Sequence, residues 1–115
     1  MTKVTDPKKI AAMIDRVEII SENTEVGCGR FNLERKTVLG HIVTVYWKGV
    51  DRKSSGAWAL GANKKLAERL KAAMESGKAF HAVEIVKDVN GKTYVSTSLA
   101  VMMRCANSDL KKLGF

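Results

Sequence analysis

The chain has 115 residues, of which 20 are Lys or Arg and 12 are Asp or Glu, so its formal net charge is +8. Hydrophobic residues make up 45% and charged residues 28%, which are ordinary values for a globular protein and exclude a disordered chain or a fibrous repeat. A chain of this length buries enough apolar surface to fold as one domain, residues 1–115, without disulfides or metals.

The N-terminal segment predicts a short helix. Asp6 and Pro7 are typical of a helix start, because Asp caps the first turn and Pro fits the first helical position. The residues that follow place one apolar stripe at helical spacing, made of Ile10, Met13 and Ile14.

The next segments favour strands. Residues 17–21 indicate a strand and residues 22–29, with two glycines, indicate a loop, whereas residues 31–38 are ambiguous. Residues 41–47 are dense in β-branched and aromatic side chains, which fit a half-buried pleated surface. Alternation places Val43, Val45 and Trp47 on the core face, and Ile42, Thr44, Tyr46 and Lys48 on the other.

A basic loop and a helix follow. Residues 51–56 are polar, basic and without periodicity, which indicates an exposed loop. Residues 63–76 predict a helix that Asn63 caps and that Gly77 ends in a left-handed conformation. Its apolar side is made of Leu66, Leu70, Ala73 and Met74.

The last third predicts a hairpin and a short helix. Residues 79–87 and 93–103 have the composition of strands, and the Asn90-Gly91 pair between them is a strong hairpin signal. Asn107 is expected to cap a terminal helix over residues 108–113. In the second strand of the hairpin, Val95, Leu99, Val101 and Met103 alternate with a polar face of Tyr94, Ser96 and Ser98 that also includes Ala100.

The order of these elements indicates a fold class. If residues 31–38 count as a strand and the terminal helices are left aside, three strands precede a helix and two strands follow it. The sequence therefore predicts an α+β fold, a small OB-like five-stranded antiparallel barrel or sheet with a helix between strands 3 and 4, plus short terminal helices. In OB folds one open face and its flanking loops bind oligonucleotides.

One part of the chain resembles a known family. The runs Leu66-Ala67-Glu68-Arg69-Leu70, Gly77-Lys78-Ala79-Phe80 and Asn90-Gly91-Lys92-Thr93-Tyr94 are similar to the second half of bacterial single-stranded-DNA-binding proteins. The resemblance spans about residues 66–103 and implies an OB fold that binds single-stranded DNA. It does not extend to the Gly/Pro-rich linker and acidic tail with which that family recruits partners, because this sequence ends in the basic run 110–115.

The positive charge is concentrated in the middle of the chain. Residues 1–29 sum to −1, residues 30–71 to +7 and residues 72–115 to +2. Clustering of one sign favours a polyanionic partner, and a merely solvated basic surface is the alternative. A single strand needs cations for its phosphates and aromatic faces for its bases. The candidate residues for such an interface are Arg30, Arg35, Lys36, Tyr46, Lys48, Arg52, Lys53, Trp58, Lys92 and Tyr94.

Other roles are open for the three aromatic candidates. A cross-strand sheet pair is the alternative to base stacking for Tyr46 and Tyr94. Trp58, among small residues, is equally compatible with a position as a lid over the helix.

We expect no enzymatic activity, cofactor or metal. The run Gly27-Cys28-Gly29-Arg30 lacks the Lys-Ser/Thr pair of a phosphate-binding loop. As a nucleophile Cys28 would need His41 or His81 beside it as a base, and nothing in the spacing brings either close. Two histidines and two separated cysteines also fall short of a zinc-binding pattern.

The expected compartment is the cytoplasm. The polar N-terminus has no signal-peptide pattern, and no apolar run reaches the roughly 18 residues of a membrane span. We therefore expect no membrane partner, and we expect Cys28 and Cys105 to be free thiols.

Together these features favour a small basic protein that binds single-stranded nucleic acid, DNA in the first place, without sequence preference. The alternative is a protein–protein interaction module or a homodimeric adaptor with no nucleic-acid role. A continuous basic groove with aromatic side chains would favour the first function, and an apolar patch at a strand edge would favour the second.

Overall fold

The computed structural model describes residues 3–26, 36–50, 57–59, 63–102 and 105–115, with only the backbone described for residues 24–26, 36–38 and 57–59. The elements are β1 (Lys3–Val4), α1 (Pro7–Met13), β2 (Ile14–Val26), β3 (Lys36–Trp47), β4 (Ala57–Ala59), α2 (Lys64–Glu75), β5 (Phe80–Lys87), β6 (Thr93–Leu99) and α3 (Ala106–Lys112).

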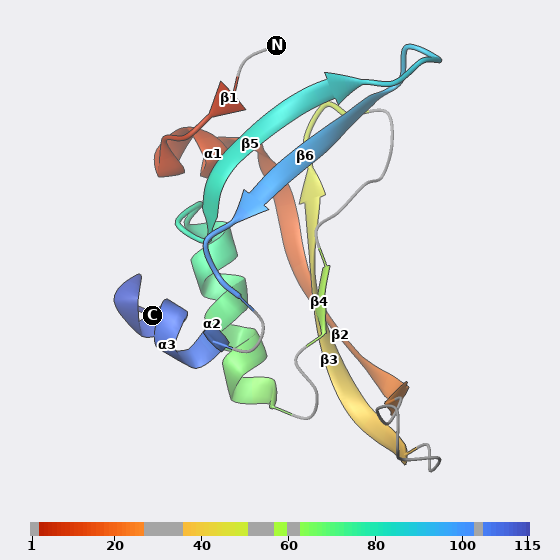
Figure 1. The fold of residues 1–115 in the computed structure, drawn as a ribbon, viewed down its shortest axis with the longest axis vertical. Coiled ribbons are helices and arrows are strands. Elements are labelled where there is room, and N and C mark those ends of the chain that lie inside the picture. Colours follow the sequence, from red (N-terminus) through yellow and green to blue (C-terminus); the bar gives the residue numbers. More distant parts are fainter. Residues whose placement is uncertain (1–2, 27–35, 51–56, 60–62, 103–104) are drawn as a thin grey trace.

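The predicted α+β class is confirmed, but the strands of the described residues form two sheets and no closed barrel. One sheet has the order β2-β3-β4 and the other β1-β5-β6, and all pairings are antiparallel. The β5–β6 hairpin crosses over the upper part of the other sheet (Figure 1). Helix α2 packs against β2 and β3, and α3 packs against α2.

The core lies between α2 and the two sheets. Its fully buried side chains come from α1, α2, α3 and both sheets, and include Ile10, Val43, Leu70, Met74 and Val83. The rings of Trp47 in β3 and Phe80 in β5 meet edge to face, with centroids 5.3 Å apart, which joins the two sheets. The prediction that Trp47 belongs to the core is confirmed, since it is 7% exposed.

Two of the three predicted helix starts are confirmed. The Asp6 carboxylate accepts a hydrogen bond from the Lys8 amide (3.1 Å), and the Asn63 side-chain oxygen accepts one from the Leu66 amide (2.9 Å). The third prediction is wrong, because α3 starts at Ala106 and Asn107 lies inside it. The Asn107 side chain instead accepts a hydrogen bond from Arg69 (2.6 Å).

Several predicted boundaries are also wrong. Ile14 opens β2 rather than closing the first helix, and residues 22–26, predicted as a loop, continue β2. The strand predicted over 41–47 starts already at Lys36. Strand β6 ends at Leu99, because the Ala100 amide turns back to the Ala79 carbonyl (2.8 Å).

The hairpin predicted around Asn90-Gly91 is confirmed, and Gly91 has a φ of 79°. Within the described ranges no helix combines the length and apolar character needed to span a membrane.

Candidate nucleic-acid interface

The structure describes the side chains of four of the ten candidate residues, namely Tyr46, Lys48, Lys92 and Tyr94. For two more it describes the backbone alone: Lys36 pairs with Val26, and Trp58 pairs with Val43. The remaining four, Arg30, Arg35, Arg52 and Lys53, lie outside the described residues.

Tyr46 lies on the outer face of the β2–β3–β4 sheet. Side chains alternate along β3, so Tyr46 points away from the core face that holds Val43, Val45 and Trp47. It is half-buried, as the alternation predicts for the non-core face. Lys48 follows directly after β3 and is exposed, while its amide donates to the Met13 carbonyl (2.9 Å).

One ring face of Tyr46 is occupied by an arginine that sequence reasoning did not select. Arg16 is the cross-strand partner of Tyr46 on β2, and its guanidinium carbon lies 4.0 Å from the ring centroid. The cross-strand pair considered as an alternative to base stacking is therefore observed for Tyr46. A base that stacks here must therefore use the ring face opposite Arg16 or the guanidinium plane itself.

Arg16 is held in place by two carboxylates. Its Nε donates to Glu18 Oε1 (2.7 Å) and its Nη1 to Asp15 Oδ2 (3.0 Å). The hydrogen bond to Glu18 is the main cause that raises the pKa of Arg16 above its usual value, with Asp15 adding to it. Because the guanidinium is already paired, Arg16 contributes less net positive charge to this surface than its type suggests.

Tyr94 lies on the outer face of the other sheet. It is half-buried and pairs with Val86 across the hairpin, on the same face as Ser96 and Ser98. A shallow hollow of about 140 Å³ lies on this sheet, lined by Lys3, Ala82, Glu84, Ser96, Thr97 and Ser98. Its lining is largely small and hydroxylic, and it carries one charge of each sign.

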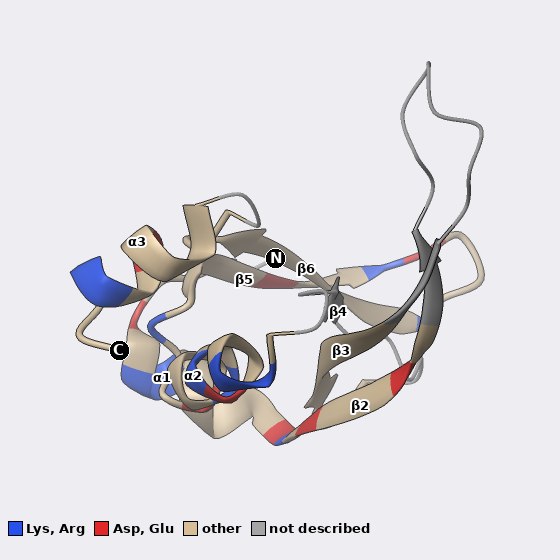
Figure 2. Ribbon diagram, turned by 90° about the horizontal axis from the view of Figure 1, so that it is seen from below, with Lys and Arg blue, Asp and Glu red and all other residues tan. Residues whose placement is uncertain are grey.

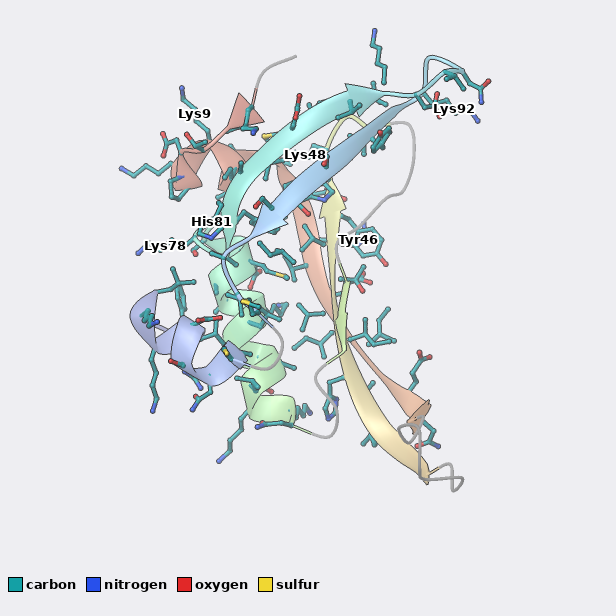
Figure 3. The ribbon with its side chains drawn as sticks, viewed as in Figure 1. Lys9, Tyr46, Lys48, Lys78, His81 and Lys92 are labelled. Atoms are coloured by element: carbon teal, nitrogen blue, oxygen red, sulfur yellow. The ribbon has the colours of Figure 1, made fainter. Side chains whose placement is uncertain are left out.

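The four described candidates thus come from both sheets. Tyr46 and Lys48 belong to the β2–β3–β4 sheet, whereas Lys92 and Tyr94 belong to the β5–β6 hairpin. In the view of Figure 3, Tyr46 and Lys92 lie on the side away from the helices, and Lys9, Lys78 and His81 lie on the helical side.

Of the cations within residues 30–71, the structure describes the side chains of Lys48 and of four residues of α2. These four are Lys64, Lys65, Arg69 and Lys71, and their helix packs on the core face of β2 and β3. These cations therefore lie on the opposite side of that sheet from Tyr46. Figure 2 shows Lys and Arg in blue on α1, α2 and α3, which lie together on one side of the molecule, whereas β2 carries red segments of Asp and Glu.

A part-buried polar pair on the core-facing side of the β2–β3 hairpin also escaped sequence reasoning. The Ser21 hydroxyl and His41 Nδ1 lie 2.7 Å apart, and His41 is 3% exposed. The pair forms because Ser21 and His41 are opposite each other in the register. Among the described residues no group of three or more His, Cys, Asp or Glu is placed to hold a metal ion.

Comparisons with known proteins identify no relative of this chain. The chain matches no protein-family model, no curated protein and no solved structure.

Proposed function

We propose that the protein binds single-stranded nucleic acid, DNA in the first place, without sequence preference, and that it does so without enzymatic activity or a cofactor. The order and pairing of the strands carry this proposal. If the two-residue β1 is set aside, a β2–β3–β4 meander is followed by α2 and then by the β5–β6 hairpin. This order matches that of the five strands and the helix of an OB fold, which supports the proposal, although the strands of the described residues form two separate sheets.

In an OB fold, oligonucleotides bind to strands 2 and 3 and to the connections between strands 1 and 2 and between strands 4 and 5. The corresponding parts of this chain are β3, β4, residues 27–35 and residues 88–92. Seven of the ten candidates belong to these parts: Arg30, Arg35, Lys36, Tyr46, Trp58, Lys92 and, directly after β3, Lys48.

The described side chains suit the chemistry of a single strand. Lys48 and Lys92 are exposed and present ammonium groups for phosphates. Tyr46, with Arg16 on one ring face, offers a planar platform on which a base can stack. Such surfaces do not distinguish base edges, so binding is expected to be independent of sequence.

The test is a titration of a fluorescein-labelled oligonucleotide of about 15 thymidines, a length that fills one site of this kind. We expect micromolar or tighter binding at low salt by fluorescence anisotropy. The logarithm of the affinity should fall linearly with the logarithm of the salt concentration, by about 0.7 for each phosphate neutralised. Absence of binding at low salt, or an affinity that salt does not change, would overturn the proposal.

Two matched double variants locate the interface. Lys48→Gln with Lys92→Gln should weaken binding and reduce the salt slope by about 1.4, because two phosphate contacts are lost. Lys111→Gln with Lys112→Gln removes the same charge from exposed positions on α3 and should leave the slope within about 0.3 of the original. Equal effects of the two double variants would mean that net charge alone drives binding.

One observation favours the second candidate function, an interaction module or homodimer. Strand β2 is 13 residues long, lies at the edge of its sheet and exposes 41% of Ile20. An edge of this length is able to pair with another strand. Sedimentation velocity of the protein alone separates the two functions, since a stable dimer with no affinity for the oligonucleotide would favour the module.

A further inference from the structure

The turn between β5 and β6 carries an apolar side chain that is fully exposed to solvent. Val89 is 101% exposed, whereas the other exposed large apolar side chains of the described residues are 40–54% exposed. The β5–β6 hairpin projects away from the helices, and this turn forms its far end (Figure 1). Val89 is therefore the first apolar group that an approaching partner meets at this end of the molecule.

The shape of the turn is fixed before anything binds. Asp88 Oδ1 accepts hydrogen bonds from the amides of Asn90 (2.8 Å) and Lys92 (3.0 Å). The Asp88 amide donates to the Lys92 carbonyl (2.9 Å), and the Gly91 amide donates to the Asp88 carbonyl (3.0 Å). These four bonds fix the backbone of the turn on both sides of Val89, which lowers the ordering cost of binding.

Cations flank this apolar tip. Lys87 and Lys92 are exposed on either side of the turn: Lys87 forms the last pair of the hairpin with Thr93, and Lys92 directly precedes Thr93. The one acidic side chain of the turn, Asp88, is directed at backbone amides. An apolar knob between two ammonium groups matches a base step, in which stacked bases lie between phosphates.

We propose that Val89 is a wedge that unstacks the terminal base pair at a junction between single-stranded and double-stranded nucleic acid. The inference rests on the proposed function, because the single strand must be held by the protein for the tip to meet the duplex end. Apolar side chains inserted at a base step unstack it in other protein–nucleic acid complexes, and a terminal pair has a neighbour on one side only.

The experiment uses a duplex with a single-stranded extension of about 15 thymidines and 2-aminopurine in the last base pair beside the extension. Because 2-aminopurine is quenched by stacking, unstacking by the bound protein should raise its fluorescence about threefold. The same protein is titrated with the labelled thymidine strand alone, which reports single-strand binding without a duplex.

Three variants identify the side chain responsible. At protein concentrations that saturate the substrate, Val89→Ser should abolish the rise in fluorescence, whereas Val89→Leu should keep the rise. Met102→Ser, at an apolar side chain that is 54% exposed and lies just before α3, is the matched control and should keep it too. Both positions are exposed, so circular dichroism and thermal melts of the variants should match the original protein.

The outcomes separate the two proposals. If the protein binds neither substrate, the proposed function fails and the wedge fails with it. If it binds the thymidine strand but leaves 2-aminopurine stacked, or if Val89→Ser still unstacks it, the wedge is overturned and the proposed function stands.

Discussion

At the residue scale, Gly77 joins two helices that are distant in the sequence. It follows α2 with a φ of 80°, in the left-handed region that side chains disfavour. A Cβ at this position would overlap the carbonyl oxygen of Pro7, the first residue of α1. Gly77 is therefore required both by its own backbone and by the close approach of α1.

We expect Gly77→Ala to destabilise the protein by more than the roughly 1–2 kcal/mol that a left-handed alanine costs, because α1 must also move. Gly49→Ala is the matched control, since Gly49 has a φ of 69° and a Cβ added there would meet nothing within 4 Å. The difference between the two free energies of unfolding, from urea titrations, measures the contact with Pro7. If the two variants lose the same free energy of unfolding, α1 moves away from the added methyl group without a measurable cost.

The positions of single residues at the candidate interface are only partly predictable from the sequence. Alternation along residues 41–47 is enough to place Trp47 in the core and Tyr46 on the other face, and the structure confirms both. It is not enough to find Arg16, because that contact depends on the register of β2 against β3. A bulge between Ile14 and Arg16 shifts this register, and a shift of one residue exchanges the two faces of a strand.

At the element scale, the ends of the helices depend on local side chains. Helix α2 is preceded by Asn63, whose side chain accepts a hydrogen bond from the Leu66 amide, as the sequence predicts. Helix α3 has no side-chain cap of this kind, since Cys105 precedes it. Its position therefore depends on other contacts, such as the hydrogen bond from the Met102 amide to Asp109 (2.9 Å) and the burial of Ala106 and Leu110.

Replacing Asn63 by Ala should lower the free energy of unfolding by about 1 kcal/mol, because the Leu66 amide loses its partner. Asn63→Asp should restore most of this loss, as aspartate caps equally well. Both values are measurable by thermal or urea unfolding followed by circular dichroism. A loss in Asn63→Ala that Asn63→Asp does not restore would contradict the capping role.

The lengths of the strands were the least predictable part of the fold. Residues 22–26 have the composition of a loop, yet they belong to β2 because residues 36–40 of β3 pair with them one by one. Strand β4 has only three residues, too few for any alternation to show. The hairpin at Asn90-Gly91 was predictable because the turn chemistry is local.

At the scale of the whole molecule, two hairpins reach beyond the core. The radius of gyration is 15.5 Å, against about 13 Å for a compact chain of this length. Leu39 in β3 and Ile85 in β5 are 48% and 40% exposed, although their strands place core residues on the same face. Parts of both hairpins therefore lie outside the core and expose apolar side chains to solvent.

Arg69 connects α2 with the C-terminal segment. Its Nε donates to the Phe115 carbonyl (2.7 Å) and its Nη1 to the Asn107 side chain (2.6 Å), so one guanidinium connects α2 both to α3 and to the residue three positions beyond it. Arg69→Met should speed amide hydrogen exchange in α3 and cost about 1–2 kcal/mol of stability. Lys71→Met, which breaks only the exposed pair with Glu75 (3.7 Å), should leave exchange in α3 unchanged.

The pairing of β1 with β5 has a consequence for how the chain acquires its structure. Lys3 and Val4 pair with Glu84 and Val83, so the earliest strand has no partner until most of the chain has been synthesised. On a ribosome that adds roughly 5–20 residues per second, this delay lasts several seconds. The β2–β3 hairpin needs no later segment to pair, so it is available as an early folding unit, and the N-terminal strand docks as a late step.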